Sequence, residues 1–95
     1  QAGLDVFIAS MGDAAREKAF ELVHSMRGAG LAADFDMIGR GLKAQMRYAD
    51  KMGARFVAII GDDELAAEEA TVKDMSTGEQ TRIAQAELVT CIRRQ

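Results

Sequence analysis

Apolar residues along the chain form either short continuous runs or clusters at helical spacing. The runs LDVFIAS at 4–10 and FVAII at 56–60 are typical of buried strands, and LAADFDM at 31–37 is a weaker run of the same kind. Between these runs, apolar residues recur every three or four positions. This spacing predicts one helix ending at a glycine within 28–30 and a second helix over about 41–53. The β-α-β-α-β order is typical of a doubly wound parallel sheet.

Side-chain chemistry indicates where the two helices begin and which face is buried. Ser10 and Asp13 fit the S-x-x-D capping pattern, which predicts that the first helix opens there. The second helix is expected to end at Gly53, where the helical spacing stops. Its residues expected to face the core are Leu42, Met46, Ala49 and Met52.

The last third of the chain has a different pattern. GDDELAAEE at 61–69 predicts a short helical turn. ATVKDMS at 70–76 alternates between apolar and polar residues, like a strand with one solvent-exposed face. The TG pair at 77–78 is a hairpin signal, and EQTRIAQ at 79–85 is the returning strand. A closing helix over 86–95 would turn three residues inward: Leu88, Cys91 and Ile92. The prediction is a three-layer α/β fold with a mixed five-stranded sheet, in which three parallel strands are followed by an antiparallel C-terminal hairpin, and with about three helices.

Composition limits the class of protein. Hydrophobic residues make up 48% of the chain and charged residues 28%, as in an ordinary globular domain. Ninety-five residues form one domain, 1–95, and a start at Gln1 indicates a fragment of a larger protein. No apolar run could cross a bilayer, and a single cysteine excludes an internal disulfide, so we expect a cytoplasmic protein without a membrane partner. No metal-ligand spacing is present.

A glycine-containing segment lies at the predicted ligand-binding edge of the sheet. With strands in the order 2-1-3, the carboxyl ends of the parallel strands share one edge, where α/β proteins bind ligands. Residues 39–44, GRGLKA, fit the G-x-G-x-x-[GA] template, and Asp62 follows about twenty residues later, as in a dinucleotide-binding fingerprint. The segment follows the second strand, however, whereas the fingerprint belongs to the first. A loop with ordinary turn glycines that opens a helix is the alternative.

Charged residues are segregated along the chain. Four cations are spaced i, i+3, i+7 and i+11 on the second predicted helix, and we call them the basic ridge: Arg40, Lys43, Arg47 and Lys51. Residues 62–69 hold five carboxylates and no base. The ridge suits contact with phosphates or another polyanion, and the alternative is a solvated helix face. No catalytic group stands out, since His24, Ser10 and Glu64 lack matched partners in a motif.

Residues 38–80 contain three motifs that together resemble a known family. They are the GR-x-LK-x-Q-x-x-YA-x-K-x-GA helix, the V-x-IIG-x-DE strand and turn, and the TVKDM-x-TGEQ hairpin. The stretch closely resembles the C-terminal anticodon-binding domain of histidyl-tRNA synthetase, and the first β-α-β unit resembles that domain more loosely. Gly41 departs from the serine frequent in the family, and Glu68 from its usual glycine.

The resemblance implies a module that binds the anticodon loop of histidine tRNA. A separate class II catalytic domain of the same chain would attach histidine, using ATP and Mg²⁺, in a homodimeric parent enzyme, a histidine–tRNA ligase. Neither class II motif arginines nor histidine-binding motifs occur in this sequence, so the fragment is expected to be non-catalytic and without a cofactor of its own. The implied fold is again a five-stranded mixed sheet with three helices.

The resemblance also implies binding residues. In the related threonyl module, anticodon bases are read by an acidic residue after the third strand and a basic residue on the fourth, and Glu64 and Lys73 stand at those positions. Both residue types suit splayed-out bases, although a helix-start acid and a wet-face strand residue are the ordinary alternatives. Further expected contacts are Arg40, Lys43 and Arg47 with phosphates, and Gln45 or Tyr48 with a base.

Two other functions fit the sequence. The first is a synthetase-like regulatory or protein-interaction domain, as carried by certain regulatory kinases and polymerase accessory subunits. The second is a small nucleotide-binding α/β domain, which would hold its ligand at residues 39–44. An anticodon-binding module should depend on anticodon sequence, whereas a nucleotide-binding domain should not.

Overall fold

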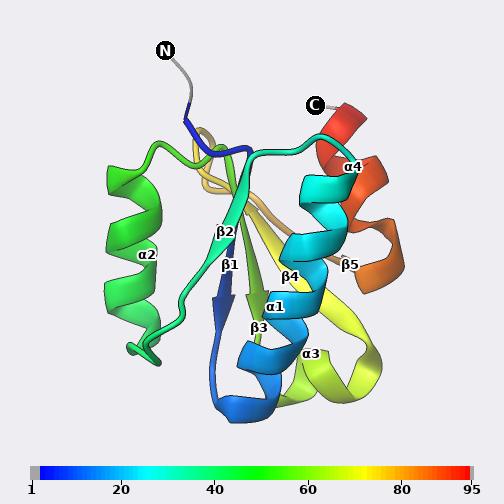
Figure 1. The fold of residues 1–95 in the computed structure, drawn as a ribbon. Coiled ribbons are helices and arrows are strands. Elements are labelled where there is room, and N and C mark those ends of the chain that lie inside the picture. Colours follow the sequence, from blue (N-terminus) through cyan, green and yellow to red (C-terminus); the bar gives the residue numbers. More distant parts are fainter. Residues whose placement is uncertain (1–2, 95) are drawn as a thin grey trace.

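A computed structural model describes residues 3–94 and places one sheet between helices (Figure 1). The strands are β1 (Val6–Ser10), β2 (Ala33–Phe35), β3 (Phe56–Ile60), β4 (Glu69–Asp74) and β5 (Gln80–Ala84). The helices are α1 (Asp13–Gly28), α2 (Leu42–Lys51), α3 (Asp62–Ala67), the 3₁₀ turn η1 (Gln85–Glu87) and α4 (Leu88–Arg94). Every predicted strand and helix is present, and β3 has the predicted bounds.

The five strands lie in the order β2-β1-β3-β4-β5. β1 is parallel to both β2 and β3, whereas β4 is antiparallel to β3 and to β5. The predicted 2-1-3 order, the three parallel strands and the C-terminal hairpin are therefore confirmed. The carboxyl ends of β1, β2 and β3 consequently share one edge of the sheet, called here the C-terminal edge.

Two apolar clusters, one on each face of the sheet, make the fold three-layered. Val6, Ile8 and Ala58 point toward α1 and α4, while Phe7 and Val57 point toward α2. In Figure 1, α2 lies on one side of the sheet and α1 and α4 on the other. The alternation follows from the period of two along each strand, and both faces of the parallel strands are covered, as their continuous apolar runs predict.

The hairpin strands leave part of the α2 side uncovered. In the antiparallel register Lys73 lies opposite Val57, and Thr71 lies opposite both Ile59 and Arg82. Directly opposed residues point to the same face, so these side chains are on the α2 side. However, α2 packs on β1, and β5 is mostly exposed. We call the side chains there the open sheet face: Thr71, Lys73, Gln80 and Arg82.

Three local predictions were wrong. Ser10 does not cap α1: it is the buried last residue of β1, and Gly12, at a φ of 96°, occupies the cap position. Met52 is 39% exposed rather than buried, because α2 ends at Lys51 and Met52 lies beyond its last turn. Cys91 is only half-buried, since α4 packs through Leu88 and Ile92, four residues apart.

Candidate nucleic-acid interface

Glu64 lies at the C-terminal edge with both of its carboxylate oxygens engaged. Gly61 at the end of β3 donates its backbone N–H to Oε1 over 3.0 Å, which closes the first turn of α3. The hydroxyl of Thr71 on β4 donates to Oε2 over 2.9 Å. The carboxylate is therefore fixed between the start of α3 and the open sheet face, and each oxygen keeps a lone pair for a further donor.

Glu64 is charged at neutral pH. Partial burial raises the pKa of its carboxyl, but the hydrogen bonds from Thr71 and from backbone N–H groups outweigh burial and hold the pKa below its ordinary value of 4.5. The positive charge of Arg82 lowers the pKa in the same direction. The site thus presents a fixed hydrogen-bond acceptor rather than a carboxylic acid.

Two cations lie beside this carboxylate. Lys73 is two residues beyond Thr71 on the same face of β4, a separation of about 7 Å along the strand. Arg82 lies opposite Thr71 on β5, and its Nε donates to Glu69 Oε1 over 2.6 Å. A fixed acceptor thus lies at one end of the open sheet face, with the Lys73 donor further along β4. Together they suit a nucleobase edge that carries both N–H groups and oxygens.

The basic ridge divides into two parts. Lys43, Arg47 and Lys51 are exposed along α2, and no carboxylate within residues 3–94 lies within ion-pair distance of them. Arg40 precedes the helix and is bound to Asp36, with Nε donating to Oδ1 over 2.8 Å. Three of the four cations are thus available to phosphates, whereas the charge of Arg40 is already paired.

Asp36 organises the segment between β2 and α2. Its side chain is fully buried, and Oδ2 accepts the backbone N–H groups of Gly39 over 2.8 Å and of Arg40 over 2.7 Å. Burial raises the pKa of Asp36, but the bonds from Arg40 and Gly39 outweigh it and hold the pKa below 3.8. The guanidinium of Arg40 lies over the Tyr48 ring, 4.8 Å from its centroid, and we call this pair the Arg40–Tyr48 stack.

Gln45 is not positioned to contact a base. It is fully buried, and its Oε1 accepts the N–H of Ser10 over 2.9 Å while its Nε2 donates to the Ser10 carbonyl over 2.8 Å. Nε2 also donates to the carbonyl of Arg40. The geometry corrects the expectation of a base contact, because the whole amide is used to tie the end of β1 to the start of α2.

The other predicted residues form two groups. Arg40 and Tyr48 lie beside Asp36, which follows edge strand β2, while Glu64 and Lys73 lie against β4. Tyr48 packs on Phe7 of β1, and β3 lies between β1 and β4, which puts the axes of these two strands about 10 Å apart. One base cannot reach both groups, so an RNA bound across this edge would place different nucleotides at each.

The glycine-containing segment has a conformational explanation. Gly39 has a φ of 91°, which favours glycine, and an added Cβ would lie 2.5 Å from Arg16 Nη1. Gly41 has an ordinary φ of −65°, and a Cβ there would meet nothing within 4 Å. The two glycines therefore do not share a need for close backbone approach, which is the physical basis of the dinucleotide fingerprint.

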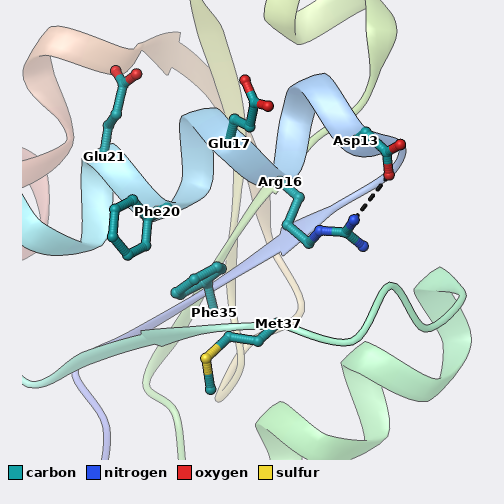
Figure 2. Close-up of a pocket in the computed structure, with 7 residues that line it drawn as sticks. All are labelled: Asp13, Arg16, Glu17, Phe20, Glu21, Phe35 and Met37. Carbon is teal, nitrogen blue, oxygen red and sulfur yellow. Dashed lines mark hydrogen bonds and ion pairs between the residues drawn. The ribbon is translucent and has the colours of Figure 1, made fainter.

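A groove of ≈ 740 Å³ runs between α1 and β2, away from the open sheet face. Figure 2 shows Phe20 and Phe35 facing each other across it, with ring centroids 5.9 Å apart, and Arg16 bonded to Asp13 at one end. Glu17 and Glu21 line its α1 side, so the groove does not favour a phosphate chain. Within residues 3–94 no group of three His, Cys, Asp or Glu could hold a metal ion, and no helix is long and apolar enough to span a membrane.

Sequence reasoning missed several residues of the interface. Asp36, Thr71 and Arg82 position or accompany predicted residues, but each reads as an ordinary polar residue in the sequence. The Asp-x-x-x-Arg spacing of Asp36 and Arg40 was the one usable signal, because residues four apart can pair around a helix start. Cross-strand neighbours such as Thr71 and Arg82 require the register, which the hairpin turn alone did not determine.

Replacing Thr71 with valine should raise the pKa of Glu64 toward its ordinary value of 4.5, because the carboxylate loses a donor that favours its charged form. The measurement is a pH titration of the Glu64 side-chain carboxyl carbon by NMR. Thr81→Val, at an exposed position of β5, is the matched control and should leave that pKa unchanged. An unaltered Glu64 pKa in Thr71→Val would show that this hydroxyl does not hold the carboxylate.

Fold and site together define a class of protein. The model of the family described as "Anticodon binding domain" matches residues 5–95, and the chain belongs to that family. Its similar relatives include histidine–tRNA ligases: that of Geobacillus kaustophilus is 49% identical over 88 residues, covering 93% of this chain and 21% of the relative. The chain thus spans about a fifth of the length of the curated relatives it matches.

Solved structures agree with this assignment. Apo histidyl-tRNA synthetase from S. aureus has 42% sequence identity and a TM-score of 0.90, over 96% of this chain and 23% of that one. The RNA binding domain of threonyl-tRNA synthetase from Cryptosporidium parvum has a TM-score of 0.84 over 94% of this chain and 22% of that chain. At 14% identity, this second similarity concerns the fold alone.

Proposed function

We propose that this chain binds the anticodon loop of histidine tRNA on behalf of a histidine–tRNA ligase. The observation that carries the proposal is the fixed Glu64 carboxylate, which is bonded to Thr71 on the uncovered part of the sheet, two residues before Lys73. Membership of the anticodon-binding family and similarity to histidine–tRNA ligases support the choice of RNA and of tRNA. The acceptor at Glu64 and the donor at Lys73 would read an unpaired base.

Base reading follows from the chemistry of the two side chains. A carboxylate accepts hydrogen bonds from the N–H groups on the Watson–Crick edge of guanine, and an ammonium group donates to base oxygens. Because Thr71 and Gly61 already hold Glu64, little side-chain freedom is lost on binding. Lys43 and Arg47, exposed on α2 near the same edge, would contact backbone phosphates and set the orientation of the loop.

The aminoacylation reaction would take place elsewhere in the parent enzyme. We assign it to a separate class II catalytic domain of the same chain, which would bind ATP, Mg²⁺ and histidine, in a cytoplasmic homodimer. The present domain would contribute tRNA selection without catalysis or a cofactor of its own. Its length, about a fifth of the similar ligases, leaves room for such a domain in the parent.

The test is a titration of this chain with the anticodon stem-loop of histidine tRNA, beside a loop with all three anticodon bases replaced. We expect preferential binding of the native loop, and a loss of about tenfold or more of that preference in Glu64→Ala and Lys73→Ala. Glu17→Ala, exposed on α1, is the control and should behave like the unsubstituted chain.

Salt dependence separates base reading from phosphate contact. Titrations at about 50 mM and about 200 mM salt give the slope of binding against salt, which should fall by about one in Lys43→Ala or Arg47→Ala while the preference for the native loop persists. Equal binding of both loops by the unsubstituted chain would contradict anticodon reading. Complete absence of binding would favour a protein-interaction role for the domain.

A further inference from the structure

The position of Arg40 is unusual for a phosphate-binding residue. Its Nε is committed to the buried carboxylate of Asp36, so its charge is already neutralised within the fold. One side of the guanidinium plane lies on the ring of Tyr48, which itself packs edge-on against the buried ring of Phe7, with centroids 5.7 Å apart. The Arg40 side chain nevertheless remains 35% exposed. A planar group is therefore held rigidly at the surface by contacts on one side.

We propose that the Arg40–Tyr48 stack is a platform on which one unpaired nucleobase of the bound RNA loop stacks, as a subsite separate from Glu64 and Lys73. The inference rests on the proposed function, which it deepens by adding a second place for a base. Arginine planes, like aromatic rings, stack on unpaired bases in RNA recognition. A guanidinium that is already oriented loses little freedom when the base arrives.

The neighbouring side chains support a base rather than a phosphate. Ile38, two residues before Arg40, is 75% exposed and is the most exposed large apolar residue within 3–94, whereas Met37 lies beside Phe35 in the groove between α1 and β2. A planar base and its sugar can cover a side chain such as Ile38, whereas a phosphate would gain nothing from it. Asp36 would also repel a phosphate that came close to the guanidinium.

Distance makes this a second subsite. The platform packs on Phe7 of β1, and the Glu64 carboxylate is bonded to Thr71 of β4. The axes of these two strands are about 10 Å apart, with β3 between them. Lys43 and Arg47 lie on α2 close to the same edge, where they could hold the phosphates between two bound nucleotides. The loop would therefore be held through two splayed bases and the backbone that joins them.

Arg40→Lys separates stacking from charge, because lysine keeps the positive charge but lacks the plane. Loops carrying the fluorescent base 2-aminopurine at each anticodon-loop position in turn would be titrated with the unsubstituted chain and with Arg40→Lys. We expect one position, other than that affected by Glu64→Ala, to show quenching that Arg40→Lys abolishes. Affinity should fall about tenfold or more with the salt slope unchanged. Lys43→Ala is the comparator, and it should lower the slope by about one.

A second variant keeps the proposal testable if Arg40→Lys disturbs the segment. Ile38→Ser changes one exposed side chain only, and it should weaken binding and reduce quenching at the same loop position. If Arg40→Lys binds like the unsubstituted chain while Arg40→Ala lowers the salt slope by about one, Arg40 contacts a phosphate and the proposal is wrong. If neither variant affects RNA binding, Arg40 takes no part in it, which also overturns the proposal.

The same titrations distinguish failure of the platform proposal from failure of the proposed anticodon reading. The unsubstituted chain could prefer the native anticodon and lose that preference in Glu64→Ala, while no loop position shows quenching that depends on Arg40. Anticodon reading would then stand, and the platform proposal would be wrong. Failure of the unsubstituted chain to bind either loop would overturn both.

Discussion

Asp36→Asn is expected to lower the free energy of unfolding by roughly 2–3 kcal/mol. The two side chains have nearly the same shape, so packing is preserved. The amide oxygen can still accept the N–H groups of Gly39 and Arg40, but the amide nitrogen would face the Nε–H of Arg40, donor against donor. A fully buried donor without an acceptor, together with the lost charge-assisted bond, accounts for the expected cost.

Urea unfolding of both proteins at neutral pH measures this difference. Asp50→Asn, an exposed position on α2, is the matched control and should change stability by less than about 0.5 kcal/mol. Equal stability of Asp36→Asn and the unsubstituted domain would mean that the Asp36–Arg40 contact contributes nothing to folding.

The same carboxylate predicts a pH dependence. Since the pKa of Asp36 is lowered from 3.8 in the folded protein, its stabilising effect is fully present above the unfolded pKa and is lost as the pH falls through the folded one. The stability difference between the unsubstituted domain and Asp36→Asn should therefore be constant from neutral pH to about pH 5 and shrink below about pH 4. A difference that stays constant to pH 3 would contradict this assignment.

Gln45→Leu should likewise destabilise the domain by roughly 2–3 kcal/mol, although leucine fills a similar volume. The amide of Gln45 bonds both backbone groups of Ser10 and the carbonyl of Arg40, all without help from solvent. Leucine leaves the buried N–H of Ser10 with no acceptor, at the point where β1 gives way to the turn before α1.

The control for this substitution is Gln80→Leu on the exposed strand β5, which removes a glutamine without breaking a buried bond. It should alter the urea midpoint little. A Gln45→Leu protein as stable as the unsubstituted domain would show that these three hydrogen bonds are offset by the gain in apolar burial.

The fold could be predicted because its signals are local and strong. β3 is a continuous apolar run, which predicts a covered strand, and the TG pair at 77–78 predicts the hairpin. Gln45 was misjudged because a polar residue in a helical pattern suggests an outward position. Its inward position depends on the unpaired backbone of Ser10, thirty-five residues away in sequence. Such long-range pairing of polar groups leaves no periodic signal.

Among the proposed binding residues, too, some could be predicted from the sequence and others depend on long-range contacts. Glu64 and Lys73 were found from the family resemblance. The structure places Glu64 after the carboxyl end of β3 and Lys73 on β4 opposite Val57, and their contact with RNA remains a prediction. The role proposed for Arg40 could not be predicted from the sequence, where it counts only as one cation of a basic series. Its geometry depends on Asp36, which accepts a hydrogen bond from Nε, and on Tyr48, whose ring lies under the guanidinium.

The alternation along β4 has a consequence for how this domain can change. Ala70 and Val72 face the core, while Thr71 and Lys73 point to the open sheet face. Alternate residues of this six-residue strand therefore serve the core and the proposed RNA contact. Under the proposed function, substitutions at the outward positions would alter which nucleotide is preferred without disturbing the interior, so evolution or design could change the specificity of this strand while the fold is kept.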